Sequence, residues 1–325
     1  MKAIALFSGG LDSTLAMKLI INQGIEVLAV NISTGFGSTK SKVEHMKNMC
    51  EQVGAKLKII DIQSEFLQDV LFDPKHGYGK HFNPCIDCHS KMFAVAKRIM
   101  EAEGASFLIS GEVMGQRPMS QNKDALQTVL DESNCDGLLL RPMCAKTLTP
   151  TIAEEKGWVD REKLEAITGR SRERQLTLAK EFGLVDFETP GGGCLLTDEN
   201  FAKKMFDFIK HDKFEVKDIP VMKFGRHLRL SDGAKLVVGR NQDENEHLQN
   251  IQNDKFYHAK TIGIPGPHAL LSVDASDEDK ELATKIILSY TKADPLQTYA
   301  ISYNEVEQKG SAFYSREEAN SFNIL

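Results

Sequence analysis

The sequence predicts an α/β fold with a doubly wound parallel sheet, followed by a smaller C-terminal α+β domain. Apolar runs of strand length alternate with amphipathic stretches of helix length through the first half of the chain, and such repeated units form a parallel sheet covered by helices. After about residue 200 the alternation gives way to a helix and then short strands with turns. The chain has 325 residues, enough for two domains, which we place at 1–200 and 201–325.

The strands and helices of the first domain follow from this alternation. Strands are expected at 3–7, 26–32, 57–62, 107–110 and 138–140, and helices at 13–23, 42–53 and 88–103. In a doubly wound sheet, ligands bind beyond the carboxyl ends of the strands. A ligand site is therefore expected in the segments 8–13, 31–37 and 111–121, which follow three of these strands.

A glycine-rich turn joins the first expected strand to the first expected helix. It reads Ser8-Gly9-Gly10-Leu11-Asp12-Ser13. Two glycines let backbone N–H groups converge on phosphate oxygens, and the helix N-terminus adds about half a unit of positive charge. No Gly-Lys-Ser/Thr follows and no third glycine occurs at the dinucleotide offset, which excludes both of those phosphate-binding motifs. The ligand expected here is a nucleoside triphosphate.

This turn resembles the PP-loop of the ATP pyrophosphatases, which adenylate a substrate and release pyrophosphate. The resemblance implies that residues 8–13 bind ATP. Asp12 is expected near Mg²⁺, because a hard cation that bridges phosphates prefers carboxylate oxygen. Ser33, Gly111 and Gln116, in the segments after two neighbouring strands, are expected to complete the nucleotide site.

Three cysteines form a second group of candidate residues. Cys85 and Cys88 lie three positions apart just before an expected helix, and Cys194 follows three glycines. Disulfides are rare in the cytoplasm, so the spacing is interpreted as metal or redox chemistry. Three interpretations remain open at this point: a redox pair or structural thiols, zinc with His89 as a further ligand, or an iron–sulfur cluster with one open iron.

A further resemblance links these motifs to transfer RNA. Residues 111–116 read Gly-Glu-Val-Met-Gly-Gln, and Arg141-Pro142-Met143 follows. Both stretches resemble those of the tRNA 4-thiouridine synthetases, over roughly residues 1–200. The cysteine pattern is similar to that of the cluster-dependent branch of tRNA thiolases. That likeness implies a [4Fe–4S] cluster held by Cys85, Cys88 and Cys194, whose open iron binds the sulfide to be transferred.

The second domain is expected to hold a hairpin and a long helix. Strands at 227–230 and 235–238 flank an Asp232-Gly233 centre that suits a two-residue turn, and a helix over 277–290 is capped by Ser276. Together with the stretches 238–241 and 264–268, this pattern resembles the NFACT-R domain, a family associated with RNA. The basic residues expected to contact phosphates are Lys223, Arg226, Arg229, Lys235 and Arg240.

A second basic stretch lies in the connecting segment 149–183, which is expected to be helical, with Thr149 and Pro150 at its start. Its basic residues are Arg161, Lys163, Arg170, Arg172, Arg174 and Lys180, with glutamates interleaved. The stretch either contacts a phosphate backbone or forms a solvated, ion-paired helix surface.

Composition sets limits on this interpretation. Hydrophobic residues make up 41% of the chain and charged residues 26%, as in globular proteins. No secretory signal and no membrane-length apolar run is apparent, so the expected location is cytoplasmic. The net charge of −6 requires that any RNA contact be a local basic patch.

Together these features predict an ATP-dependent tRNA sulfurtransferase. A uridine carbonyl oxygen attacks the α-phosphate, pyrophosphate leaves, and sulfur then displaces AMP, giving a thiolated uridine that the resemblance implies is 4-thiouridine. Asp12 and Cys194 are the expected catalytic residues, and the sulfur donor is sulfide or a persulfide made by a cysteine desulfurase. Two alternatives are a zinc-containing PP-loop ligase acting on a small nucleobase and a non-catalytic, nucleotide-sensing RNA-binding protein.

Overall fold

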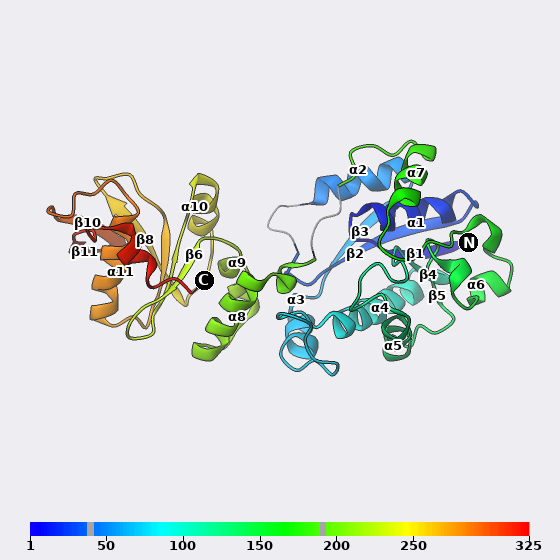
Figure 1. Ribbon diagram of the computed structural model, residues 1–325, viewed down its shortest axis with the longest axis horizontal. Coiled ribbons are helices and arrows are strands. Elements are labelled where there is room, and N and C mark those ends of the chain that lie inside the picture. Colours follow the sequence, from blue (N-terminus) through cyan, green and yellow to red (C-terminus); the bar gives the residue numbers. More distant parts are fainter. Residues whose placement is uncertain (38–41, 189–192, 325) are drawn as a thin grey trace. The chain divides into compact units, whose positions relative to one another are not determined.

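The computed structural model describes residues 1–37, 42–188 and 193–324 as two compact units, Met1–Thr197 and Asp198–Leu325 (Figure 1). Each unit has its own sheet. Among the described residues, no helix combines the length and the apolar character that crossing a membrane requires. We describe each unit by itself.

A five-stranded parallel sheet forms the centre of the N-terminal unit. Its strand order is β3-β2-β1-β4-β5, and the strands are β1 (Lys2–Leu6), β2 (Glu26–Ser33), β3 (Lys56–Asp61), β4 (Phe107–Ser110) and β5 (Leu139–Leu140). The chain builds outward from β1 first through β2 and β3, and then on the other side through β4 and β5. The carboxyl ends of β1 and β4 therefore form a topological switch point, where ligands bind in folds of this kind. The predicted fold class is confirmed.

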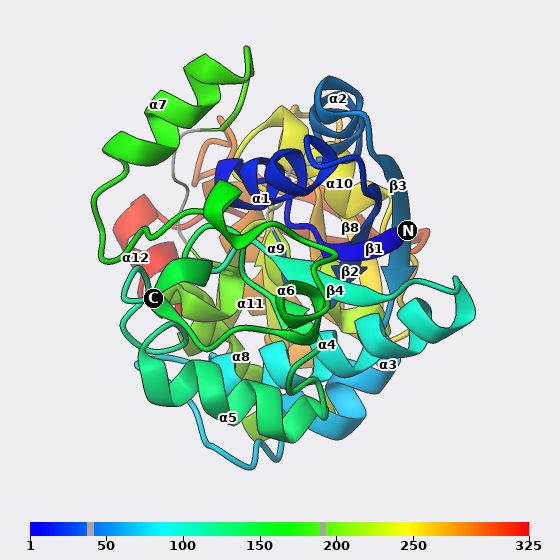
Figure 2. The ribbon, with the colours of Figure 1, turned by 90° about the vertical axis from the view of Figure 1, so that its right-hand side faces the viewer.

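Helices cover both faces of this sheet. They are α1 (Leu11–Ile21), α2 (Val43–Val53), α3 (Gln63–Phe66), α4 (Cys85–Ala102), α5 (Lys123–Ser133), α6 (Ile152–Glu155) and α7 (Glu173–Glu181). Figures 1 and 2 show α1, α2 and α7 on one face and α4 and α5 on the other. The predicted helix over 149–183 is wrong in its extent: only short helices form there, and Thr151 caps α6 through a capping box with Glu154.

The helix that follows the glycine-rich turn is buried along almost its whole length. Leu15, Met17 and Ile20 are each fully buried, and residues of α1 pack on both the sheet and α7. Such a helix loses packing when it moves, because protein interiors are close-packed. The start of α1 is thus a fixed point on which a ligand site can be built.

A six-stranded antiparallel sheet forms the C-terminal unit. Its strand order is β11-β10-β8-β9-β7-β6, with β6 (Arg226–Arg229), β7 (Lys235–Val238), β8 (Phe256–Ile262), β9 (Ala269–Ser272), β10 (Tyr299–Tyr303) and β11 (Val306–Gly310). Its helices are α8 (Glu199–His211), α9 (Ile219–Lys223), α10 (Gln242–Gln249), α11 (Asp277–Ser289) and α12 (Arg316–Asn320). As predicted, the Ser276 side chain caps α11.

The turn of the first hairpin differs from its prediction. Arg229 pairs with Lys235, which leaves five residues, 230–234, in the connection. The Leu230 N–H donates to the Ala234 carbonyl at 2.9 Å, so the loop closes one residue beyond the regular ladder. Gly233, at φ +102°, supplies the backbone conformation that this longer loop needs. The predicted two-residue turn is therefore wrong.

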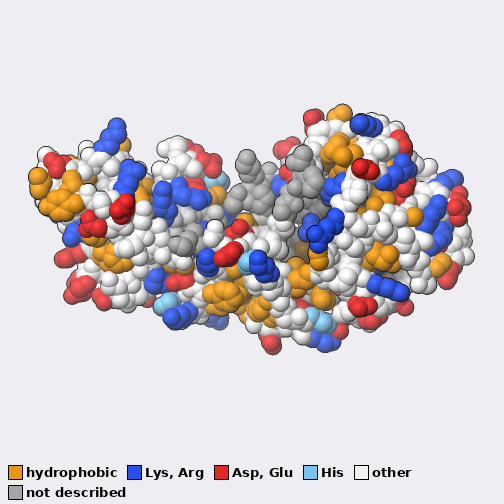
Figure 3. Space-filling view, viewed as in Figure 1, with side chains coloured by type: hydrophobic (Ala, Val, Ile, Leu, Met, Phe, Trp, Pro, Cys, Tyr) orange, Lys and Arg blue, Asp and Glu red, His pale blue; other side chains and the backbone are white. Residues whose placement is uncertain are grey.

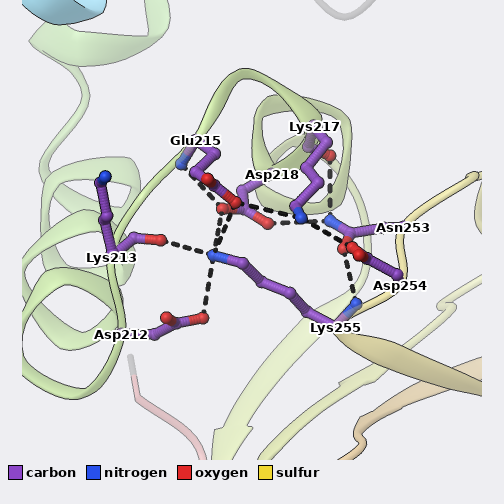
Figure 4. Close-up of polar contacts among 8 residues, drawn as sticks. All are labelled: Asp212, Lys213, Glu215, Lys217, Asp218, Asn253, Asp254 and Lys255. Atoms are coloured by element: carbon purple, nitrogen blue, oxygen red, sulfur yellow. Dashed lines mark hydrogen bonds and ion pairs between the residues drawn. The ribbon is translucent and has the colours of Figure 1, made fainter.

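A polar network fastens the segment after α8 to the start of β8 (Figure 4). The ammonium group of Lys255 lies 3.0 Å from carboxylate oxygens of Asp212 and Asp218, and it also donates to the Lys213 carbonyl. Asp218 is fully buried, and it accepts a further hydrogen bond from Asn253 at 2.8 Å. The buried carboxylate of Asp218 thus has both a charged partner and hydrogen-bond donors, which is the condition for burying a charge without a large penalty.

Candidate nucleotide and thiol site

The glycine-rich turn has the backbone geometry of an anion cradle. Gly9 adopts φ +82°, and Gly10 is the N-cap residue of α1. The Ser13 hydroxyl donates to the Gly10 carbonyl at 2.9 Å and lies 3.3 Å from the Ser8 hydroxyl. The first N–H groups of a helix have no intrahelical acceptor and bind anions readily. Leu11 is buried in the core, so only its backbone can contribute to the site.

Gly111 brings the loop after β4 against this turn. A Cβ atom at Gly111 would lie 2.4 Å from the Ser13 nitrogen and 2.5 Å from the Ser13 Cα. No other residue type allows that approach without displacement of the backbone. The segments at 8–13 and 111–116 therefore meet at the switch point of the sheet, as the sequence predicts.

Asp12 lies where these two segments meet. Its Oδ2 accepts a hydrogen bond from the Gln116 side chain at 2.8 Å and pairs with the Arg172 guanidinium at 2.5 Å. Its other oxygen, Oδ1, is buried and has no hydrogen-bond donor among the described residues. A buried carboxylate oxygen without a partner fits a hard cation such as Mg²⁺.

Ser33 is less closely tied to the site. It is the last residue of β2, and its carbonyl accepts from the Ile62 N–H at 3.0 Å. Because β2 runs parallel to β1, Ser33 lies at the same edge of the sheet as the turn. The contacts of the described residues do not join its side chain to Asp12 or Gln116.

Sequence reasoning missed the role of Arg172. In the sequence it is one of six basic residues in a stretch rich in glutamate, and nothing sets it apart. The structure pairs it with a carboxylate 160 positions earlier, while Arg174 pairs with Glu165 and Glu181. Arg172 thus contacts the candidate nucleotide site, and Arg174 belongs to the ion-paired surface.

The three candidate cysteines lie near one another. Cys85 and Cys88 occupy the first turn of α4. The Phe82 N–H donates to the Leu196 carbonyl at 3.2 Å, which brings the segment after Cys194 alongside the segment before α4. Burial raises the pKa of the Cys88 thiol, and the nearby Cys194 and Cys85 thiols raise it further. Loss of surrounding water likewise raises the pKa of Cys194.

The metal-binding role expected for these three thiols stays a prediction. No group of three or more His, Cys, Asp and Glu side chains there is arranged to hold a metal ion. His89, the further zinc ligand considered above, instead has its Nδ1 3.0 Å from Glu112 Oε1. The [4Fe–4S] cluster remains a prediction, and we derive no chemical step through it.

Glu112 connects the nucleotide residues to the thiol residues. It follows Gly111 in the chain and contacts His89, which follows Cys88, and the Arg141 Nε donates to it at 2.8 Å. Burial raises the pKa of Glu112, but Arg141 and His89 outweigh burial and hold the pKa at about 2. A buried, ionised carboxylate therefore joins the two halves of the candidate site.

Comparison with known proteins finds similarity to a different family in each unit. Residues 1–153 match the family described as thiamine biosynthesis protein (ThiI). Residues 225–322 match the NFACT protein RNA binding domain. The chain resembles two families. Both resemblances given by the sequence are thereby confirmed, and neither match bears on the iron–sulfur branch.

Among curated relatives, the "Probable tRNA sulfurtransferase" of Thermococcus kodakarensis is 32% identical over 117 residues, which is 35% of this chain and 30% of the relative. The tRNA-specific 2-thiouridylase MnmA of Francisella tularensis subsp. novicida is 24% identical over 238 residues, 70% of this chain and 63% of the relative. The chain thus spans less than two thirds of the length of each.

Two solved structures show partial overlap with this chain. A 4-thiouridine synthetase bound to RNA and ATP has 19% identity and a TM-score of 0.38, over 56% of this chain and 51% of that one. The C-terminal part of a fibronectin/fibrinogen-binding protein from Streptococcus suis has 14% identity and a TM-score of 0.27, over 55% and 87%.

Proposed function

We propose that this protein is an ATP-dependent tRNA sulfurtransferase that converts a uridine to 4-thiouridine. One observation carries the proposal: a PP-loop turn with an unsatisfied carboxylate oxygen at Asp12 lies in the same unit as three neighbouring thiols, and Glu112 links the two groups. The matches to sulfurtransferase relatives and to an RNA-binding family support it.

The first step is adenylation of the uridine. Its carbonyl oxygen attacks the α-phosphate of ATP, and pyrophosphate departs with the electron pair of the broken bond. The N–H groups of the turn stabilise the negative charge on the phosphates. Asp12 would hold Mg²⁺, which would supply further charge neutralisation. AMP attached to the uridine is then a good leaving group.

The second step uses the three cysteines Cys85, Cys88 and Cys194. Cys194, the exposed member of the three, carries a persulfide whose terminal sulfur comes from a cysteine desulfurase. That sulfur attacks the activated carbon, AMP leaves, and a disulfide joins Cys194 to the uridine. Cys85 or Cys88 then attacks the Cys194 sulfur, which releases the thiouridine and leaves a protein disulfide. An external thiol reductant restores the cysteines after each turnover.

The RNA would bind to the C-terminal unit through cations that lack an internal carboxylate. Arg229 and Lys235 both pair with Asp207, and Arg240 pairs with Glu244, so the structure does not support these three predicted phosphate contacts. On the face shown in Figure 3, basic and acidic side chains are interleaved.

A different group in the C-terminal unit combines cations with aromatic rings. Arg226 lies over the Tyr290 ring at 4.7 Å, and Lys285 lies over Phe313 at 5.2 Å. Tyr314, beside Phe313 in the chain, is 79% exposed. Aromatic rings stack with unpaired bases while cations contact phosphates, so this group is the proposed RNA contact.

The proposal is tested by a nucleoside inventory of tRNA from cells with and without the gene. We expect one thiolated uridine to disappear in its absence and to return with the wild-type gene, but not with Asp12→Ala or Cys194→Ala. In vitro, Asp12→Ala should stop pyrophosphate release, whereas Cys194→Ala should retain it. An unchanged inventory in a host with no second thiolase contradicts the proposal.

Assays of the purified protein distinguish the persulfide route from the iron–sulfur cluster. Activity that depends on a desulfurase and a thiol reductant supports the persulfide route. Iron with acid-labile sulfide, found after anaerobic purification and lost in a Cys85→Ala variant, supports the cluster instead. Zinc alone, with no effect on tRNA, favours a ligase acting on a small nucleobase.

A further inference from the structure

Arg172 reaches the nucleotide site from outside the two segments that form it. It is the N-cap residue of α7, and its side chain is 24% exposed. Its guanidinium lies 2.5 Å from Asp12 Oδ2, the same oxygen to which Gln116 donates. A cation of the protein thus pairs with the carboxylate of the turn.

The segment that carries Arg172 is fastened beside the turn. The Gly169 N–H donates to the Met114 carbonyl at 2.8 Å, and Thr168 forms a parallel bridge with Met114. Gln175, one turn further along, is fully buried and donates to the Gln116 side chain at 3.2 Å. The segment therefore runs along the loop after β4. Contacts on both sides of Arg172 hold its backbone beside the turn.

The contacts of Arg172 leave most of its binding capacity unused. A guanidinium has five N–H donors in a planar fork, and among the described residues Arg172 uses one nitrogen, in its contact with Asp12. Arg174, two positions later, bonds with Glu165 and Glu181 through three of its nitrogens. Among the described residues, Arg172 therefore keeps four of its five N–H donors without a partner, whereas Arg174 keeps two.

We propose that Arg172 is a phosphate-binding residue for ATP, held in place by Asp12 until the nucleotide arrives. Its remaining N–H donors bind the polyphosphate next to the turn, as arginine forks do with phosphate oxygens. Before that, its positive charge opposes binding of a divalent cation at Asp12. This inference rests on the proposed use of ATP and makes Arg172 responsible for coupling metal binding to nucleotide binding.

The proposal predicts effects of opposite sign from one substitution. In Arg172→Gln, affinity for ATP in the presence of Mg²⁺ should fall about 10-fold to 100-fold, the usual loss for a hydrogen bond to a charged group. Affinity for Mn²⁺ without nucleotide should rise, because the competing cation is gone. Calorimetry with ATP and electron paramagnetic resonance with Mn²⁺ measure the two affinities. Arg172→Lys, which keeps the charge, should bind Mn²⁺ like the wild type.

Arg174→Gln is the matched control, because it removes an arginine of the same helix that is bonded elsewhere. It should leave both affinities unchanged. Equal ATP affinity in Arg172→Gln and the wild type would overturn the inference, and so would weaker Mn²⁺ binding. If the wild-type protein binds no ATP at all, the proposed function itself fails, and that outcome is distinct.

Discussion

The candidate nucleotide site of the N-terminal unit and the Lys255 network of the C-terminal unit differ in whether their buried polar atoms have partners. Asp12 Oδ1 and Gln175 Oε1 are buried without a partner among the described residues. Lys255, by contrast, contacts the carboxylates of Asp212 and Asp218 and the Lys213 carbonyl (Figure 4). Unsatisfied buried groups are rare because they cost stability. His227 Nδ1, in the C-terminal unit, is also buried without a partner among the described residues. The two atoms beside the glycine-rich turn mark a site that a ligand would complete, whereas the Lys255 network is structural.

If this contrast is correct, Asp12→Asn removes activity and leaves stability nearly intact. Pyrophosphate release in the presence of tRNA should fall at least about 100-fold, because the carboxylate that would hold Mg²⁺, the cation that neutralises the phosphates, is lost. The urea midpoint of the N-terminal unit should change little, since the substitution keeps the shape of the side chain. Trp158 is the only tryptophan and packs against the N-terminal core, so its fluorescence reports this unfolding. A large loss of stability would show that Asp12 is structural.

Glu112→Gln should show the reverse pattern, a large loss of stability. The substitution leaves the guanidinium of Arg141, which is 3% exposed, without its charged partner. Breaking a buried pair in this way costs about 3 to 5 kcal/mol. Trp158 fluorescence in urea measures it. Glu103→Gln, at a more exposed ion pair with Lys2, is the control and should stay close to the wild type.

The contribution of Glu112 also has a defined pH dependence. Its pKa is about 2 in the folded protein, compared with about 4.3 in an unfolded chain. A lowered carboxyl pKa stabilises the fold fully above the unfolded value, and the stabilisation is lost as the pH falls towards 2. The difference in stability between wild type and Glu112→Gln should therefore narrow below about pH 4. A constant difference from pH 7 to pH 3 would contradict this assignment.

Lys255→Met should destabilise the C-terminal unit by a smaller amount. It leaves the fully buried Asp218 with uncharged donors only, at a cost of about 2 kcal/mol. Hydrogen exchange of the β8 and β9 amides, followed by mass spectrometry, measures the opening of this unit separately from the other. Lys217→Met removes a lysine that pairs with the exposed Asp254, and it should have a clearly weaker effect. Equal effects would remove the distinction between buried and exposed partners.

Local signals predicted much of this fold. The strand 107–110 agrees with β4 residue for residue, and the strand–turn–helix predicted around residues 8–13 is present. The helix α5 was not predicted, and residues 149–183 were expected to form more helix than they do. Helix propensity is weak beside tertiary packing, so it does not fix such segments.

Local sequence signals predict the candidate site even less completely than the fold. Gly111, Gln116 and Asp12 lie together because the strand order places the ends of β1 and β4 side by side, and that order follows from the α/β pattern. Arg172 follows β5, outside any strand end, and its pairing with Asp12 depends on how a loop packs. No periodicity in the sequence encodes such a contact.

Lys204 differs from Lys255, because it is a buried lysine without a hydrogen-bonded carboxylate among the described residues. It gives the test with the smallest expected effect. It lies on α8 and is 8% exposed. Burial and, to a smaller extent, Arg240 lower its pKa to about 8, although Glu244 and Asp198 act in the opposite direction. The described residues provide no hydrogen bond to its ammonium group.

Lys204→Met should therefore stabilise the C-terminal unit at pH 7, by about 1 to 2 kcal/mol, because it removes a buried charge without a hydrogen-bonded partner. Between about pH 8 and 10.4 the unfolded chain keeps the lysine proton while the folded unit releases it, so the wild type gains stability as the pH rises. The advantage of the variant should shrink over that range. Hydrogen exchange at pH 7, and urea unfolding at pH 7 and 9.5, measure the change. Lys203→Met, which removes an exposed neighbour paired with Glu199, is the control. A Lys204→Met variant that is less stable at pH 7 would show that the ammonium group has a stabilising partner, and that the C-terminal unit matches all its buried charges.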